Sequence, residues 1–287
     1  YQLKPGKNVI TVPEIYSNSW EKKTAKGGAV YLLNRYTKEE QGKAPVVTIE
    51  GGETFPLYNE GDDKEQFLKE LKEYKKKLDE APENTVDLFE FNTNRILYTG
   101  TTSSAYKVYV EEGVDIEKST NNLNSQIQEA FDFSGLKDDI SDPSNDSTNI
   151  KTTIRLMQPY GLAYAYVDHV GIQRDYETSM LKTDKSSLGS VLWATVHEVG
   201  HQMDIDARAW PEITNNMWAN NAYIKNGLND RVQYDKLYKY LAPEKSLKTY
   251  EELDYSEKLG MFWQLQIKKN KMQRPDRNVR ALIPYPC

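Results

Sequence analysis

The chain has 287 residues, a formal net charge of −6, and contains 38% hydrophobic and 28% charged residues. That length suffices for one large domain or two modest ones with a substantial buried core. The acidic balance, without a basic tail or an arginine-rich helix, argues against nucleic acid as a partner. No apolar run in the sequence approaches the ~18 residues of a membrane span, so no membrane-spanning segment is predicted.

The remaining bulk features bear on the setting of the protein. The single cysteine, Cys287, is the last residue, so an internal disulfide is impossible. The 20 tyrosines suit a surface that contacts sugars or peptides, or simply a polar-surfaced fold. The chain begins at Tyr1 without a methionine or a signal peptide. It is therefore expected to be a processed product or a monomeric module excised from a larger multidomain protein.

Residues 1–60 are predicted to form a small β-rich subdomain. Short apolar or alternating segments separated by glycine and proline indicate three strands, at 8–12, 29–33 and 45–49. Nothing in this stretch has a catalytic pattern.

The hydrophobic period changes at Asp62. Asp62 and Glu65 predict a capping box, and apolar residues recur at helical spacing until Pro82 ends the helix. Strands are then predicted at 86–91, 96–99 and 106–110. A second amphipathic helix begins near Ser119, and 132–150 is predicted to be an exposed acidic loop.

Residues 152–158 and 162–168 predict a hairpin that turns at Pro159-Tyr160-Gly161. Tyr164 and Tyr166 share one face of the second strand, which is the last strand before the motif helix. This strand is therefore the candidate for the wall of a cleft. His169 follows it, and its role stays open between a loop residue and a transition-state donor.

The sequence His197-Glu198-Val199-Gly200-His201 is an H-E-x-x-H motif in an apolar run that predicts a helix starting near Ser187 or Ser190. Residues four apart lie on one helix face, so both imidazoles address one point. Two imidazoles and a carboxylate form the ligand set of a catalytic zinc site whose fourth position is left to water. Glu198 lies beside this ligand face, where it can act as the general base. The alternative is two core histidines in a chance match.

Glu212 is the predicted third ligand. Pro211 suits the first turn of a new helix, which would present Glu212 early in it. The alternatives are that Glu212 only stabilises a helix N-terminus, or that Asp204, Asp206 or Glu198 is the ligand instead. Asp204 is also a candidate acceptor that orients an imidazole, and Asn216 is a candidate hydrogen-bond partner of a ligand histidine.

Two core-packing helices are predicted to close the chain, one around 234–241 and one around 259–267 with Ser256 as its cap. The fold class predicted is α+β. Residues 61–185 are predicted to form the sheet-containing part and residues 186–287 the helical part of one catalytic domain.

The motif at 197–201, the run Glu212-Ile213-Thr214-Asn215-Asn216 and the run 259–265 together resemble the enhancin-like zinc metallopeptidases of the M-sixty peptidase family. This group includes bacterial mucin-degrading peptidases and viral enhancins, and the resemblance extends to the region 51–58. It implies a gluzincin-type module, a mixed sheet followed by a mainly helical half. It also implies a secreted or cell-surface protein, with His197, His201 and Glu212 as zinc ligands and Glu198 as the catalytic residue.

The function that the resemblance implies is zinc-dependent hydrolysis of peptide bonds in O-glycosylated proteins such as mucins. Tyr164, Tyr166 and His169 are candidate donors to the oxyanion. Two alternatives remain open: a general zinc endo- or aminopeptidase without glycan dependence, and a carbohydrate- or host-surface-binding module with a vestigial site.

Overall fold

The structure, a computed structural model, describes residues 4–11, 15–16, 24–25, 29–31, 46–157, 162–204, 209–241 and 249–273. The chain divides into two compact units, one of residues 1–127 and 149–191 and one of residues 128–148 and 192–287. A mixed sheet together with helices confirms the α+β class. The predicted domain boundary near residue 60 stays a prediction.

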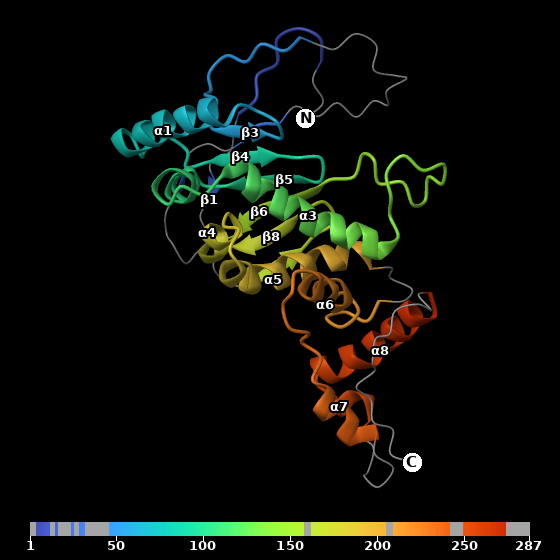
Figure 1. The fold of residues 1–287 in the computed structure, drawn as a ribbon. Coiled ribbons are helices and arrows are strands. Elements are labelled where there is room, and N and C mark those ends of the chain that lie inside the picture. The colour runs from blue at the N-terminus through green and yellow to red at the C-terminus, as the bar shows by residue number, and fades with distance from the viewer. Residues whose placement is uncertain are drawn as a thin grey trace. The chain divides into compact units, whose positions relative to one another are not determined.

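The first unit is built on a six-stranded mixed sheet with the order β3-β4-β5-β6-β8-β7 (Figure 1). Antiparallel pairing joins β4 to β5 and β7 to β8, whereas the other neighbours are parallel. A separate antiparallel pair is formed by β1 and β2. The strands are β1 (Ile15–Tyr16), β2 (Thr24–Ala25), β3 (Leu57–Asn59), β4 (Phe89–Asn92), β5 (Ile96–Gly100), β6 (Thr152–Met157), β7 (Ala163–Ala165) and β8 (Val170–Gln173).

The helical elements lie between and after these strands. They are α1 (Lys64–Glu80), α2 (Thr102–Ala105), η1 (Tyr106–Glu111), α3 (Ile116–Ser134), η2 (Arg174–Tyr176), α4 (Glu177–Met180), α5 (Lys185–Met203), α6 (Asn216–Lys225), α7 (Tyr234–Leu241), η3 (Tyr250–Glu252) and α8 (Tyr255–Gln273). Within the described ranges, no helix is both long and apolar enough to cross a membrane.

Helix α1 follows the predicted pattern. Phe67, Leu71 and Leu78 are its buried residues, and the helix ends at Glu80, before Pro82. Its cap, however, is Asp63, whose carboxylate accepts hydrogen bonds from the first-turn amides of residues 65 and 66. Asp62 accepts instead from the backbone of Asn59 in the preceding strand, so the predicted cap was wrong by one residue.

Three other helix starts lie upstream of the predicted serines, in each case because an aspartate accepts from the amides of the first turn. Asp115 precedes α3 and accepts from the amides of residues 117 and 118. Asp184 precedes α5 and accepts from the amide of Ser187. Asp254 precedes α8 and accepts from the amide of Glu257, while the Ser256 hydroxyl donates to the same carboxylate.

Aromatic rings fill the core of the first unit. Phe89 on β4 is fully buried and lies near four other rings, with centroid separations between 5.8 and 6.3 Å. On neighbouring strands, Phe91 and Tyr98 stack at 4.7 Å. The residues that pack around Phe89 are Phe67, Phe91, Tyr98 and Tyr109. Because such rings bury large areas and pair favourably, they supply much of the burial that holds the sheet to its helices.

Two strand predictions in this unit were wrong. The predicted hairpin of 152–158 with 162–168 does not form, because β6 pairs in parallel with β8 and only β7 returns antiparallel, also to β8. The turn predicted at 159–161 lies outside the described residues. Residues 106–111 form the π-helical turn η1 rather than a strand, because Thr101 caps a helix that starts at Thr102 and runs into it.

The predicted N-terminal strands are also absent where the structure describes them. Residues 8–11, 29–31 and 46–49 lie outside any strand, and the rest of those segments is not described. One of these residues is still tied to the sheet, since the Tyr31 hydroxyl donates to the buried carboxylate of Glu90 on β4.

The second unit is mainly helical. Its core gathers Val232, Leu259 and Trp263, which are at most 6% exposed, and partly buried residues of α3, α5 and α6 pack against them. The helices predicted around 234–241 and 259–267 are confirmed as α7 and α8. The second unit also contains the C-terminal half of α5, which carries the H-E-x-x-H motif.

Candidate metal centre

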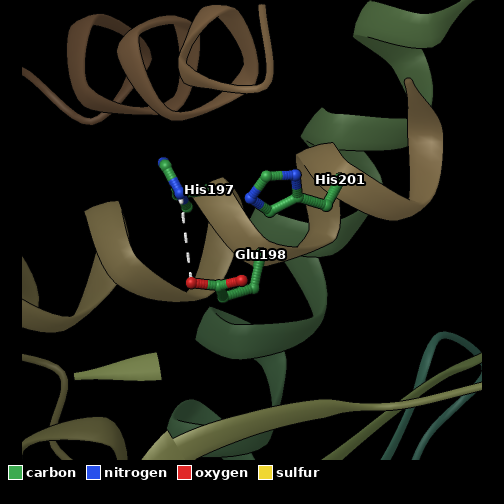
Figure 2. Close-up of side chains that lie close together, drawn as sticks. All are labelled: His197, Glu198 and His201. Atoms are coloured by element: carbon green, nitrogen blue, oxygen red, sulfur yellow. Dashed lines mark ion pairs between the residues drawn. The ribbon is translucent and has the colours of Figure 1, made fainter. Parts of the chain in front are cut away.

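The motif lies on the C-terminal half of α5, in the second unit. Leu192, Val196 and Val199 are buried on one side of the helix. Both histidines lie on another side, four residues apart, with their rings 5.0 Å apart. His197, Glu198 and His201 each offer a potential ligand atom within 4.8 Å of the others (Figure 2). The helix thus brings the three side chains together, as the spacing of the motif predicts.

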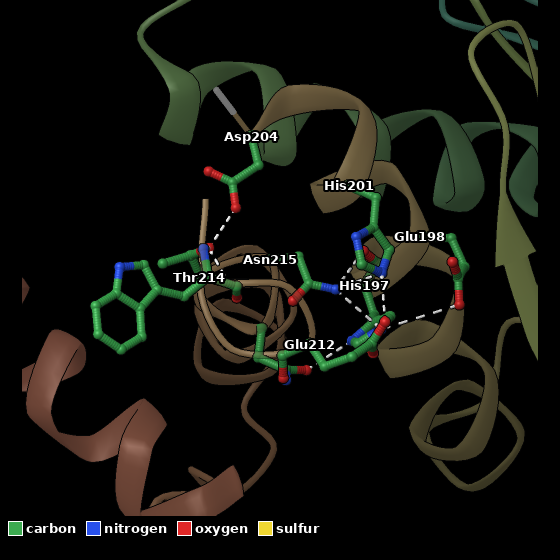
Figure 3. Close-up of polar contacts among 9 residues, drawn as sticks. His197, Glu198, His201, Asp204, Glu212, Thr214 and Asn215 are labelled. Carbon is green, nitrogen blue, oxygen red and sulfur yellow. Dashed lines mark hydrogen bonds and ion pairs between the residues drawn. The ribbon is translucent and has the colours of Figure 1, made fainter. Parts of the chain in front are cut away.

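Glu212 reaches the same point from the turn before α6. Its two carboxylate oxygens lie 3.0 Å from His197 Nε2 and 3.2 Å from His201 Nε2 (Figure 3). The helix predicted from Pro211 onward was wrong, because residues 211–215 form a turn and α6 begins at Asn216. Glu212 has a φ of 65°, in the left-handed region that a residue with a side chain rarely adopts. Backbone strain of this kind clusters at functional sites.

The protonation pattern shows that these residues fit a cation. The Asn216 amide nitrogen donates to the carbonyl of Glu212, so its oxygen faces His197 Nδ1 at 2.7 Å. Nδ1 must then donate its proton to this oxygen, which leaves Nε2 to offer its lone pair to a metal. That lone pair faces a Glu212 oxygen at 3.0 Å, and two acceptors are stable so close only with a cation or proton between them.

The pKa values of Glu198 and His201 are shifted in opposite directions. Burial, and secondarily the negative charge of Glu212, raises the pKa of the Glu198 carboxyl from 4.5 to about 7. Burial, and secondarily His197, lowers the pKa of His201, so its imidazole is neutral and able to bind a metal. Glu198 is only 7% exposed, and its carboxylate lies 4.0 Å from His197 Nε2. A desolvated carboxyl with a pKa near neutrality has the property required of a general base.

A polar contact ties the turn to the end of α5. The Thr214 hydroxyl donates to Asp204, the residue after α5, and accepts from the backbone of Trp210 at 2.8 Å. Asp204, predicted to orient an imidazole, thus bonds across to the turn that carries Glu212. Thr214 was not singled out from the sequence, because only the closed turn reveals its partner.

Asn215 was also missed as a site residue, although it belongs to the run that carried the family resemblance. It is fully buried, and its amide nitrogen lies 2.9 Å from the Nε2 atoms of both His197 and His201. Its backbone oxygen is pressed against α5 at Gly200, where an added Cβ would lie 2.6 Å from it. Gly200 therefore makes room for the turn itself.

A pocket of about 720 Å³ opens beside these residues, entirely within the second unit. The guanidinium carbon of Arg231 lies 4.3 Å from the centre of the Trp193 ring and 4.7 Å from that of Tyr223. One Arg231 nitrogen donates to the Tyr223 hydroxyl at 2.6 Å. The lining residues are Trp193, His197, Glu212, Asn216, Asp230, Arg231, Val232, Gln233, Tyr255, Ser256 and Leu259.

Tyr164, Tyr166 and His169 belong to the first unit. His169 is buried, with Nδ1 at 2.6 Å from Arg155 and Nε2 at 3.0 Å from the Tyr164 hydroxyl. The Tyr166 ring lies 5.5 Å from the His169 ring. The three residues therefore form one cluster, and their part in stabilising an oxyanion stays a prediction.

The fold and the site define a class. In this α+β chain, two histidines of one helix, the buried glutamate between them and the carboxylate of Glu212 meet at one site. This combination is typical of a metallopeptidase. Residues 51–275 match the family model described as peptidase M60, enhancin and enhancin-like, so the chain belongs to this family.

Solved structures agree with that assignment. The M60 catalytic domain of ZmpC from Clostridium perfringens, in complex with the sialyl T antigen, is 25% identical with a TM-score of 0.80, covering 94% of this chain and 54% of that one. The catalytic module of the metalloprotease ZmpA from the same organism is 27% identical with a TM-score of 0.75, covering 96% of this chain and 55% of that one.

A third structure joins the M60 catalytic domain of C. perfringens ZmpB to two further domains, CBM51-1 and CBM51-2. It is 26% identical with a TM-score of 0.77, covering 94% of this chain and 29% of that one. The present chain therefore spans about half the length of the ZmpC and ZmpA chains, and less of the ZmpB chain. A comparison with curated proteins found no significant match.

Proposed function

We propose that this chain is the catalytic part of a secreted or cell-surface zinc endopeptidase that hydrolyses peptide bonds in O-glycosylated proteins such as mucins. The observation that carries the proposal is the meeting of both motif histidines with the Glu212 carboxylate, 3.0 and 3.2 Å away, beside a buried Glu198. Family membership supports the peptidase activity.

His197, His201 and Glu212 would hold the zinc ion, with Asn216 fixing the ring orientation of His197. When bound, the ion supplies Lewis acidity to a water molecule and to the scissile carbonyl. Glu198 accepts the proton of the attacking water and then delivers it to the leaving amine. Its burial keeps bulk water from competing for that proton.

The pocket beside the histidines supports a glycosylated substrate. Aromatic faces and a guanidinium offer the stacking surfaces and the hydrogen-bond donors that a sugar ring requires. The exposed Tyr255 and the Arg231 guanidinium line the pocket and can supply them here. The relative ZmpC was crystallised with a glycan, the sialyl T antigen. We infer that the sugar of the substrate lies in this pocket, next to the peptide bond that is cut.

The peptidase proposal is tested by incubating the chain with an O-glycosylated protein, with and without a chelator, and mapping new termini by mass spectrometry. Cleavage that stops with chelator and returns with zinc is expected. Glu198→Gln should lower the rate about 10²–10⁴-fold while still binding zinc, because it removes only the base. Full hydrolysis by that variant would contradict the role given to Glu198.

The two rival functions give different results. A zinc peptidase without glycan dependence would cut the same protein equally well after enzymatic removal of its O-glycans. A glycan-binding module with a vestigial site would bind the intact glycoprotein in the presence of chelator and release no peptides.

The pocket has its own test. Arg231→Ala should lower cleavage of the glycosylated substrate and leave zinc binding unchanged. Arg174→Ala, at an arginine that does not line the pocket, is the matched control. Equal loss in both variants would remove the pocket from the proposal.

A further inference from the structure

The side chain of Asn215 contacts both of the predicted ligand histidines, and the proposed function gives it no role. Its amide nitrogen is 2.9 Å from His197 Nε2 and 2.9 Å from His201 Nε2, the two atoms that would bind the metal. Figure 3 shows this amide between the two rings, on the side from which the turn approaches. Among the described residues, Asn215 is therefore the one whose side-chain amide contacts both predicted nitrogen ligands.

The position of Asn215 is fixed by its backbone. The carbonyl group and Cα of residue 215 pack on Gly200, one helical position before His201, so closely that an added Cβ would lie 2.6 Å from the carbonyl oxygen and 3.2 Å from Cα. The next residue is held as well, since Asn216 bonds both His197 and the carbonyl of Glu212. The backbone of Asn215 therefore cannot move away from the two rings without moving this whole turn.

The other end of the same amide is unsatisfied. Asn215 Oδ1 is buried and has no hydrogen-bond partner among the described residues. An orphaned buried acceptor is costly and needs an explanation such as a missing ion. The oxygen and nitrogen of an asparagine amide differ only by a half-turn of the group and are assigned from their surroundings. The surroundings here change when a cation takes the Nε2 lone pairs, since the amide hydrogens then have nothing to bond.

We propose that Asn215 is a fourth protein contact of the metal site, with its side-chain oxygen turned to the bound ion. The proposal rests on the zinc site of the proposed function and deepens it. Without metal, the amide hydrogens bridge the two Nε2 atoms and keep the rings aimed at one point. With metal, the amide turns by half, and its oxygen adds to the negative charge density around the ion. Asn215 thus holds the rings ready for the ion and then helps to retain it.

The test is the zinc affinity of the purified chain, measured by competition with a chromophoric chelator. Asn215→Ala should bind zinc about 10–100-fold more weakly, the usual cost of losing a group that supports metal ligands. Asn215→Asp places an oxygen at the same point and should bind at least as tightly as the wild type. Asn226→Ala, at the opposite end of α6, removes an amide that bonds Ala222 and Glu129 and should leave the affinity unchanged.

Melting temperatures with and without zinc give a second measurement. The Asp variant places a carboxylate against two Nε2 lone pairs, so its metal-free form should melt lower than the wild type and gain more from zinc, because a ligand that binds only the folded state raises its stability. If Asn215→Ala does not fold, Asn215→Leu against Asn215→Asp makes the same comparison at constant size.

Three results are decisive. Unchanged zinc affinity in Asn215→Ala or Asn215→Leu would overturn the proposal. An equal loss of affinity in Asn215→Asp would also overturn it, since an oxygen at this position would then not help to retain the ion. A wild-type chain that binds no zinc would instead overturn the proposed function, which separates the two failures.

Discussion

The six-stranded sheet of the first unit and the turn at 211–216 of the second are held together by different forces. In the sheet, Phe89 is surrounded by four aromatic rings, and no single contact dominates. The turn is held instead by a few hydrogen bonds between polar atoms. Asp204 receives the Thr214 hydroxyl, and the Asn216 amide joins the carbonyl of Glu212 to His197.

The difference is one of direction as well as strength. Apolar packing is nearly proportional to the area buried and has little orientation, so a sheet core yields gradually to substitution. Hydrogen bonds have narrow geometry, and the turn uses them to keep Glu212 at a φ of 65°. The comparison teaches that many non-directional contacts hold the sheet, whereas the geometry of the metal centre depends on a few atoms of the turn.

The largest expected effect on stability comes from the sheet. Phe89→Ala should lower the free energy of unfolding by about 3–5 kcal/mol, because it empties the centre of the aromatic cluster. Zinc affinity of the folded protein should stay within a few-fold of the wild type. Urea denaturation followed by circular dichroism measures the first quantity and chelator competition the second. Leu57→Ala, at a 40% exposed position on β3, is the control and should cost far less.

Gly200→Ala should reverse that pattern. The added methyl would meet the backbone of Asn215 at 2.6 Å, and backbone cannot rotate away as a side chain can. Overpacking costs about 1–3 kcal/mol, but the turn must shift, so zinc affinity should fall by about 10–100-fold. Gly189→Ala in the same helix has open space around its Cβ and should leave zinc binding unchanged. Equal zinc affinity in both variants would mean that the turn does not depend on Gly200.

Local periodicity predicted those parts of the fold that each element determines by itself. The buried face of α1 and the presence of α7 and α8 follow from apolar spacing along one helix. The convergence of His197 and His201 is of the same kind, because one helix turn sets it. These features can be predicted without knowing which other elements of the fold pack against the helix.

Features that depend on a distant partner could not be read in this way. The strand β6 pairs with β8 rather than with β7, a choice made by the sheet as a whole. Residues 106–111 alternate like a strand but continue a helix that Thr101 begins. Their buried Val108 and Tyr109 serve either geometry.

The same limit applies to the metal centre. The position of Glu212 after the motif, together with the family resemblance, predicted it as the third ligand, but the turn that carries it could not be foreseen. The left-handed conformation of Glu212 depends on bonds that Thr214 and Asn216 make across the site. Asn215 addresses both imidazoles only because Gly200 admits its backbone.

A smaller effect is expected from Thr214→Val, which keeps the shape of the side chain and removes its hydroxyl. The bond to Asp204 is lost, at a cost of about 0.5–1.5 kcal/mol in the free energy of unfolding. The turn should loosen, so zinc affinity should fall several-fold, less than in Gly200→Ala. Thr120→Val removes a hydroxyl that bonds only within α3, to the carbonyl of Glu117, and is the control for both measurements. A zinc affinity equal to that of the control would show that Asn216 alone holds the turn.

The smallest effect is predicted for Glu177, a buried polar group of the sheet unit that holds its neighbours by directional bonds, as the turn does at the metal centre. Glu177 is 1% exposed, and its carboxylate accepts from the backbone and the hydroxyl of Thr101, at the start of α2. Burial raises its pKa above 4.5, although the Thr101 bonds oppose that shift. The folded protein therefore holds this proton to a higher pH than the unfolded chain does.

Because the unfolded state binds fewer protons here, the contribution of Glu177 to stability is fully present below pH 4.5 and declines as the pH rises through its raised pKa. Glu177→Gln keeps the neutral shape and can still accept from the Thr101 amide, so it lacks this decline. As the pH is raised from 4.5 to neutrality, the urea midpoint of Glu177→Gln should rise relative to that of the wild type. Parallel curves for the two proteins would show that the bonds from Thr101 stabilise the charged carboxylate as well as the neutral acid. Directional bonds would then govern this point of the sheet unit as they govern the turn.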